Sequence, residues 1–281
     1  MMAAPRLVLA AALLAAPAAA QEVRRPLLEA GVFTGGGLIP DYPAADRSRA
    51  RPLVLPWLVY RGDLIQSDER GLRGRLYRMT DLELTLNANG ALAAPSSGGA
   101  REGMPDLDYL GEIGPSLRWT PWRSEDRATR LTLDLPVRAV FGTDLSRVRH
   151  RGFVFAPEFA LERARVFTAE DRVRVGIGPV FATGPLMDYW YRVRPEEARP
   201  GRPAYQAEGG YLGTRLQFSY RTPVTPRVWL TVGGRVENFS GARNADSPLF
   251  RSEWNAALIG GVSFTLFQSG ASVATRPEAL E

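Results

Sequence analysis

Apolar and polar residues alternate with a period of two between Leu131 and Phe141. Every second residue is apolar, from Leu131 through Leu135 to Phe141, and the positions between them include Asp134 and Arg138. Because side chains alternate between the two faces of a strand, one face of this segment is apolar along its whole length and the other carries charge. Such a strand fits a wall that has an apolar medium on one side and water on the other.

The same alternation returns along most of the chain. We place eleven strand-like segments, at residues 27–34, 52–61, 63–77, 81–89, 109–119, 129–141, 153–162, 172–181, 211–221, 227–237 and 253–267. A soluble β-sandwich or a lipocalin-like barrel is the alternative, but the pattern is more typical of a barrel with a lipid-facing exterior. Bacterial single-chain barrels have even strand numbers, so one segment must be split or merged wrongly. We predict an all-β, antiparallel transmembrane β-barrel of about 12 strands, with about 10 as the alternative.

The N-terminus has the order of a cleaved secretory signal: Arg6, an apolar stretch from Leu7 to Leu14, and small residues at 18–20. After residue 20, no apolar run approaches the roughly 18–20 residues that a membrane helix needs. We therefore expect a signal peptide at residues 1–20, a barrel at 21–267 and a C-terminal tail at 268–281 that lacks a strand pattern. An exported chain of this kind is expected in the cell outer membrane.

All 35 basic residues are arginine, and the chain has no cysteine. Export argues against nucleic acid as the partner of this basic chain, whose pI is about 9.9. Arginine suits ion pairs inside a lumen and the phosphates of outer-membrane lipid and lipopolysaccharide. Without cysteine there is no disulfide, no thiolate metal site and no lipid-modified N-terminal cysteine.

Charged residues of both signs fall on the predicted lumen face. They are Glu83, Glu112, Arg130, Asp134, Arg138, Arg172, Arg174, Arg215, Arg235 and Glu237. Neighbouring strands can pair opposite charges across the wall, so mutual neutralisation is the simplest interpretation. A selectivity lining for a solute path is the alternative.

We find no pattern for catalysis, for a cofactor or for a metal. His150 is the single histidine, so a metal site built on several histidines is excluded, and no serine motif accompanies it for nucleophilic catalysis. The glycine run at 35–37 lacks the Lys and Ser/Thr of a phosphate-binding loop. The chain is therefore expected to be non-enzymatic.

Two long connections, residues 90–108 and 182–208, contrast with a short one at 221–226. Since bacterial barrels have short periplasmic turns and longer external loops, the long connections should share the outer side, provided that the miscounted strand lies before residue 90. Pro195 and the acidic pair after it favour one helical turn in the second loop. The aromatic residues 189–191 and Tyr205 either pack this loop over the barrel mouth or form an exposed patch for a partner.

Three stretches in these connections and at the strand ends are more distinctive than a barrel requires. Their residues are Pro40, Asp41 and Tyr42, then Tyr60, Arg61, Gly62 and Asp63; next Gly103, Met104, Pro105 and Asp106; and last Pro195, Glu196 and Tyr205. In this order and spacing, the chain resembles the MltA-interacting protein (MipA)/OmpV family of outer-membrane proteins over roughly residues 27–267.

The resemblance implies a Gram-negative outer-membrane barrel without catalytic residues. It implies a scaffold that links a lytic transglycosylase to a penicillin-binding murein synthase, and thus a role around peptidoglycan. A small-solute channel and a surface adhesin remain the alternatives. The short turns weaken the scaffold hypothesis, because they leave a small periplasmic surface.

Overall fold

The computed structural model describes residues 23–60, 65–68, 71–78 and 81–275. The predicted signal peptide lies outside the described residues, as do Arg61, Gly62 and Asp63.

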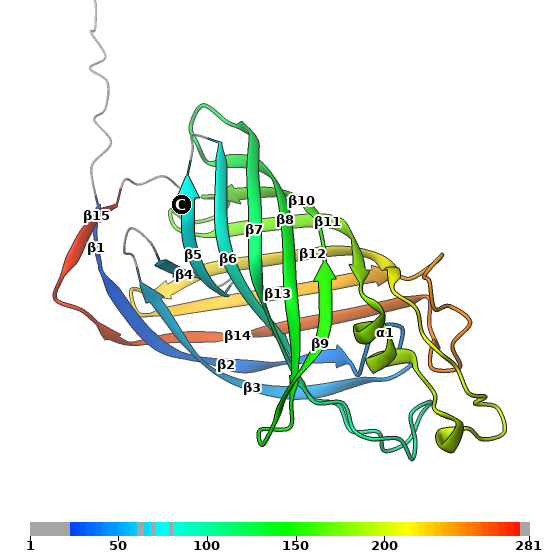
Figure 1. The fold of residues 1–281 in the computed structure, drawn as a ribbon. Coiled ribbons are helices and arrows are strands. Elements are labelled where there is room, and N and C mark those ends of the chain that lie inside the picture. Colours follow the sequence, from blue (N-terminus) through cyan, green and yellow to red (C-terminus); the bar gives the residue numbers. More distant parts are fainter. Residues whose placement is uncertain (1–22, 61–64, 69–70, 79–80, 276–281) are drawn as a thin grey trace, which may run out of the picture.

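One antiparallel sheet of thirteen strands dominates the described part of the chain (Figure 1). Its strands are β2 (Leu28–Pro40), β3 (Ser48–Tyr60), β4 (Ile65–Asp68), β5 (Gly71–Arg78), β6 (Leu82–Ala91), β7 (Tyr109–Arg123), β8 (Thr129–Thr143), β9 (Val148–Phe155), β10 (Glu158–Ala164), β11 (Arg172–Ala182), β12 (Gly210–Thr225), β13 (Val228–Asn238) and β14 (Trp254–Gln268). β9 and β10 lie end to end between β8 and β11, and each of them pairs with both of these neighbours. The thirteen strands therefore occupy twelve positions in the wall. The predicted barrel of about 12 strands is confirmed.

The sheet curls so that the first and last wall strands pair. β14 pairs with β2 from Leu258 opposite Leu38 to Gln268 opposite Glu29. Ladders then continue without interruption from β3 round to β4. β3 and β4 contact each other at the remaining seam, where the described residues carry no backbone ladder.

The miscounted segment is 63–77, which the structure divides into β4 and β5. These two short strands pair antiparallel, with Asp68 opposite Gly71. The error therefore lies before residue 90, and the two long connections do share one end of the barrel (Figure 1). The sequence signal for this reversal is the polar run at 66–70 before Gly71, which interrupts the alternation and which the sequence analysis did not use as a turn.

The tail forms a strand that the sequence analysis did not expect. β15 (Ser272–Thr275) pairs antiparallel with β1 (Val23–Pro26), outside the main sheet (Figure 1). Leu27 N donates to Ala271 O at 2.8 Å, which continues the contact toward the barrel. The segment is too short for a hydrophobic period to emerge, and its partner lies at the other end of the chain.

Large apolar side chains cover the outer face of the wall and are exposed there. They include Val137, Phe153, Phe159, Ile177, Leu216 and Leu258. Trp119 and Trp122 lie near the end that carries the short turns, while Phe155, Phe181 and Tyr211 form a ring series near the other end, with centroids 6.2 and 5.7 Å apart. Two aromatic girdles of this kind mark the two lipid–water interfaces of a transmembrane barrel.

The apolar face of β8 is long enough to cross a bilayer. On β8, Leu131 lies opposite Trp122 and Phe141 lies opposite His150, roughly ten residue steps along the strand. At about 3.3 Å per residue and a tilt of about 40°, these steps span about 25 Å, the height of the apolar band in outer-membrane barrels.

The two ends of the barrel differ. Short turns at 124–128, 165–171 and 226–227, together with β1 and β15, form one end, which we name the turn rim. Connections at 41–47, 92–108, 183–209 and 239–253 gather at the other end (Figure 1) and form what we name the loop cap. The loop cap holds α1 (Gly184–Tyr191) and a 3-10 turn, η1 (Pro195–Glu197). Within the described residues, no helix is long and apolar enough to cross a membrane.

Candidate functional site

The loop cap is a packed layer of side chains over one mouth of the barrel. Two of its four connections supply Leu186, Met187, Tyr191, Phe239 and Leu249, each 1% exposed or less, and the other two add smaller buried residues to the same core. Sequence alternation could not locate this core, because its members come from loops with no period. A Gly-Pro pair at the start of α1 was the available signal for the helix, since proline favours the first turn.

Two buried tyrosines join three of the connections. The Tyr42 hydroxyl donates to Leu249 O at 2.8 Å, and the Tyr191 hydroxyl donates to Pro43 O at 2.9 Å. Their rings meet edge to face, with centroids 6.5 Å apart. Burial raises the pKa of both hydroxyls well above the ordinary tyrosine value, so each remains a proton donor throughout the physiological range.

The predicted packing of the aromatic loop is confirmed. Tyr191 is buried, and Tyr189, Trp190 and Tyr205 pack against the same core. Burial, followed by the negative charge of Asp108, raises the pKa of Tyr189 to about 12. The single helical turn expected at Pro195 is confirmed as η1.

Two arginines are buried in the loop cap with backbone carbonyls as their partners. Arg101 donates to Trp190 O at 3.1 Å and to Pro105 O at 3.2 Å. Arg202 donates to Ala100 O and Glu102 O at 2.9 and 2.8 Å, and to Glu197 O from two nitrogens. These contacts tie the 92–108 connection to the 183–209 connection. Sequence reasoning missed both residues, because arginine is ordinarily read as exposed.

Most of the distinctive stretches meet in the loop cap. Asp41, just after Pro40 at the end of β2, accepts from Arg49 Nε at 2.9 Å and from Arg51 Nη2 at 3.0 Å. Asp106 accepts from Ser96 N at 2.6 Å. Met104 is buried, Gly103 adopts a left-handed turn (φ 77°), and the carbonyl of Pro105 accepts from Arg101. Glu196 is exposed, and the Tyr205 hydroxyl donates to Asn244 Oδ1 at 3.2 Å. Tyr60 ends β3 at the opposite end of the barrel.

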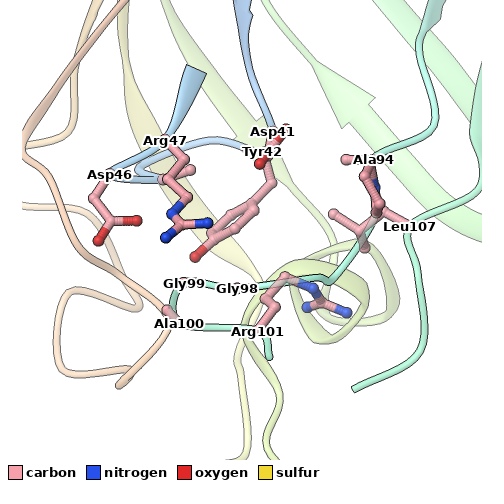
Figure 2. Close-up of a pocket in the computed structure, with 12 residues that line it drawn as sticks. Asp41, Tyr42, Asp46, Arg47, Ala94, Gly98, Gly99, Ala100, Arg101 and Leu107 are labelled. Atoms are coloured by element: carbon pink, nitrogen blue, oxygen red, sulfur yellow. The ribbon is translucent and has the colours of Figure 1, made fainter. Parts of the chain in front are cut away.

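A small hollow lies beside Tyr42 (Figure 2). The Arg47 side chain lies against Gly98 and Gly99, and the Arg101 guanidinium lies over the Tyr42 ring, 5.9 Å from its centroid. Its volume, about 10 Å³, holds one water molecule at most. The hollow is therefore a packing gap rather than a ligand site.

The lumen carries a connected set of ion pairs on β7, β8, β10 and β11. Asp134 accepts two hydrogen bonds from Arg118, at 2.6 and 2.8 Å, and a third from Arg174 at 3.3 Å. Arg174 also pairs with Glu158 and with Glu162. Arg130 pairs with Glu162 at 2.7 Å.

The other predicted lumen residues lie in smaller groups. Arg138 pairs with Glu112 at 2.8 Å. Glu237 pairs with Arg215 at 2.8 Å and with Arg235 at 3.2 Å. In register, Glu83 lies opposite Arg118 and Arg172 lies opposite Arg221. Pairs of opposite sign thus occupy much of the lumen wall, where each side chain supplies a counter-charge for its neighbour.

The described residues contain no group of three or more His, Cys, Asp or Glu side chains that could hold a metal ion. His150 lies between Phe141 and Phe153, with ring centroids 5.5 and 5.0 Å away.

Solved structures similar to this chain include several barrels, all distant. A bacterial polysaccharide outer-membrane secretin has 9% identity, a TM-score of 0.39, and coverage of 86% of this chain and 99% of its own. The outer-membrane phospholipase A of Escherichia coli has 12% identity, a TM-score of 0.33, and coverage of 84% and 90%. The toluene transporter TodX of Pseudomonas putida has 9% identity, a TM-score of 0.29, and coverage of 87% and 68%.

A search of the curated proteins finds no match. The family model of MltA-interacting protein MipA matches residues 32–266, which contain nearly the whole wall and the entire loop cap. The resemblance to this family is thereby confirmed, and the chain belongs to the MipA family.

Proposed function

We propose that this outer-membrane barrel is a non-enzymatic scaffold, which binds a lytic transglycosylase at its turn rim. The family is named for an interaction with MltA, a lytic transglycosylase. A penicillin-binding murein synthase is the proposed second partner, so that hydrolysis and synthesis of peptidoglycan are held together. The turn rim faces the periplasm in this proposal, because short turns lie on that side of bacterial barrels.

The observation that carries the proposal is the two-stranded sheet of β1 and β15. It adds a structured element to a rim that otherwise has only short turns. Both of its strands have an edge whose backbone groups can pair with an extended segment of another chain. The surface available to a periplasmic partner is thus larger than the turns alone provide.

The channel alternative is less well supported. The loop cap packs a core over one mouth, and ion pairs occupy much of the lumen wall. A solute would have to displace both. The adhesin alternative would use the outer surface of the loop cap.

Site-specific photocross-linking tests the scaffold. Amine-reactive reagents are unsuitable, because the chain has no lysine. A photoreactive residue replaces Val224 or Ala271 at the turn rim, and the exposed Leu145 at the opposite end serves as the matched control. We expect the rim positions, and not position 145, to capture a lytic transglycosylase in cells. Equal capture at all three positions, or capture of unrelated proteins alone, would reject the proposal.

A further inference from the structure

A hollow of about 260 Å³ opens on the outer surface of the loop cap. Its lining comes from four segments, at 46, 99–100, 199–202 and 248–251. It shares Asp46, Gly99 and Ala100 with the smaller hollow of Figure 2 and lies next to it. Unlike its neighbour, it has room for a small ligand.

The lining is cationic. It includes Arg199, Arg202 and Arg251 against one acidic residue, Asp46. Arg251 meets Asp46 at 3.8 Å, and Arg199 meets Glu102 at 3.9 Å; all four of these side chains are more than two-fifths exposed. Exposed ion pairs at such distances contribute little, so both guanidinium groups can turn to another anion at small cost.

The charge behind the hollow has no direct ion pair within the described residues. Arg202 is 6% exposed and Arg101 is 7% exposed, and the partners recorded for both are carbonyl oxygens. Within the described residues, neither forms a salt bridge, and Arg101 Nε lacks a hydrogen-bond partner. Burial is the main cause that lowers the pKa of both groups; repulsion from a neighbouring arginine lowers it as well, and the more distant Glu197 carboxylate acts in the opposite direction. Buried cations ordinarily have an anionic partner, because an isolated charge loses much of its hydration.

We propose that the hollow binds an anionic group, a carboxylate or a phosphate, on a molecule of about monosaccharide size. Its volume falls just below the roughly 300–1,000 Å³ of drug-sized pockets, which restricts the occupant to a small one. Arg199 and Arg251 contact the anion from the rim, and the buried positive charge of Arg202 attracts it from below. The occupant is either a free solute or the acidic end of a surface glycan, which present the same chemistry.

Calorimetric titration of the purified, detergent-solubilised barrel tests this site. The probes are glucose 6-phosphate, glucuronic acid and inorganic phosphate, with glucose as the neutral control. We expect saturable binding of at least one anionic probe at millimolar concentration or below, weakened by salt, and none of glucose. Binding of inorganic phosphate indicates a free anion as a sufficient occupant, whereas binding of the sugar acids alone indicates a glycan end.

Two double variants make the test specific. Arg199→Gln with Arg251→Gln removes the rim cations, and we expect at least tenfold weaker binding. Arg192→Gln with Arg243→Gln removes the same charge from exposed ion pairs elsewhere in the loop cap and should retain the affinity. Heat-modifiable migration on gels verifies that each variant is folded. The absence of saturable binding for all three anions, or an equal loss in both double variants, would overturn the proposal.

Discussion

Replacing Asp134 with Asn tests whether the lumen excludes water. Asp134 accepts a two-pronged contact from Arg118, and their side chains are 11% and 8% exposed. Asn has the same shape but no charge, so Arg118 and Arg174 would each lose an anionic partner. The substitution therefore changes the electrostatics with little change in packing.

The expected magnitude depends on the medium. In a water-poor lumen, removing one partner of a buried pair costs about 3–5 kcal/mol, because water cannot replace the charge-assisted contact that Arg118 loses. In a water-filled channel, the same pair contributes about 0–1 kcal/mol. Since both side chains are nearly buried, we expect the larger loss of unfolding free energy.

Equilibrium unfolding in urea, in lipid vesicles and followed by tryptophan fluorescence, measures this difference. The matched control is Arg123→Gln, because Arg123 pairs with Asp81 at 2.5 Å near the turn rim, where the side chains are 33% and 53% exposed. We expect the control to lose less than about 1 kcal/mol. A loss of this small size for Asp134→Asn would show a hydrated lumen and would refute the reasoning.

Three further predictions concern the turn rim, the loop cap and the pairing of β2 with β14. Burial by itself would raise the pKa of Asp171, but backbone N–H donors from 166–168 hold the pKa below the ordinary value. Asp171→Asn should therefore lower the free energy of unfolding by about 1–3 kcal/mol at pH 7. In thermal unfolding, the difference between the variant and the parent should disappear as the pH falls below about 4, because the Asp171 carboxyl then becomes protonated. Tyr191→Phe removes the hydrogen bond to Pro43 O and should lower the free energy of unfolding in urea by about 1 kcal/mol. An unchanged free energy of unfolding would show that the Tyr191 hydroxyl bonds to water instead of to Pro43 O. Gly261→Val should abolish the heat-modifiable folded band, because a Cβ at this position would lie 2.4 Å from Thr34 O. Gly260→Ala is the control and should fold, because its Cβ would lie 3.9 Å from the nearest atom. Equal folding of the two variants would contradict the close approach of β2 and β14.

The wall of the barrel was predictable because lipid imposes a repeated pattern on it. Every lipid-facing position between Leu131 and Phe141 must be apolar, and this requirement is local in sequence. The reversal between β4 and β5 was missed although a polar run ending at Gly71 interrupts the alternation there, because that run was included in a single strand. Strand ends were placed less well, as at β2, which continues six residues past Thr34 to Pro40.

The candidate site was predictable only in part. The distinctive stretches marked the loop cap, but their convergence depends on contacts between distant connections, such as Tyr42 with Leu249. The burial of Arg101 and Arg202 depends on carbonyl groups that loops place around them, and no sequence spacing encodes that arrangement. The paired β1 and β15 likewise require knowledge that both chain ends return to one rim.

The pairing of β2 with β14 constrains the order in which the molecule can be made. Leu38 and Leu258 stand opposite each other although most of the chain separates them. Until β14 is in place, the edges of β2 and β13 that it pairs carry unpaired N–H and C=O groups, which the hydrocarbon region does not tolerate. A chain truncated before β14 should therefore be unable to insert. A chain that lacks only β15 should still pair β14 with β2 and should lose only the pairing of β1 with β15. β14, the last strand of the wall, is thus required for insertion, because only a chain that contains it can pair the free edge of β2.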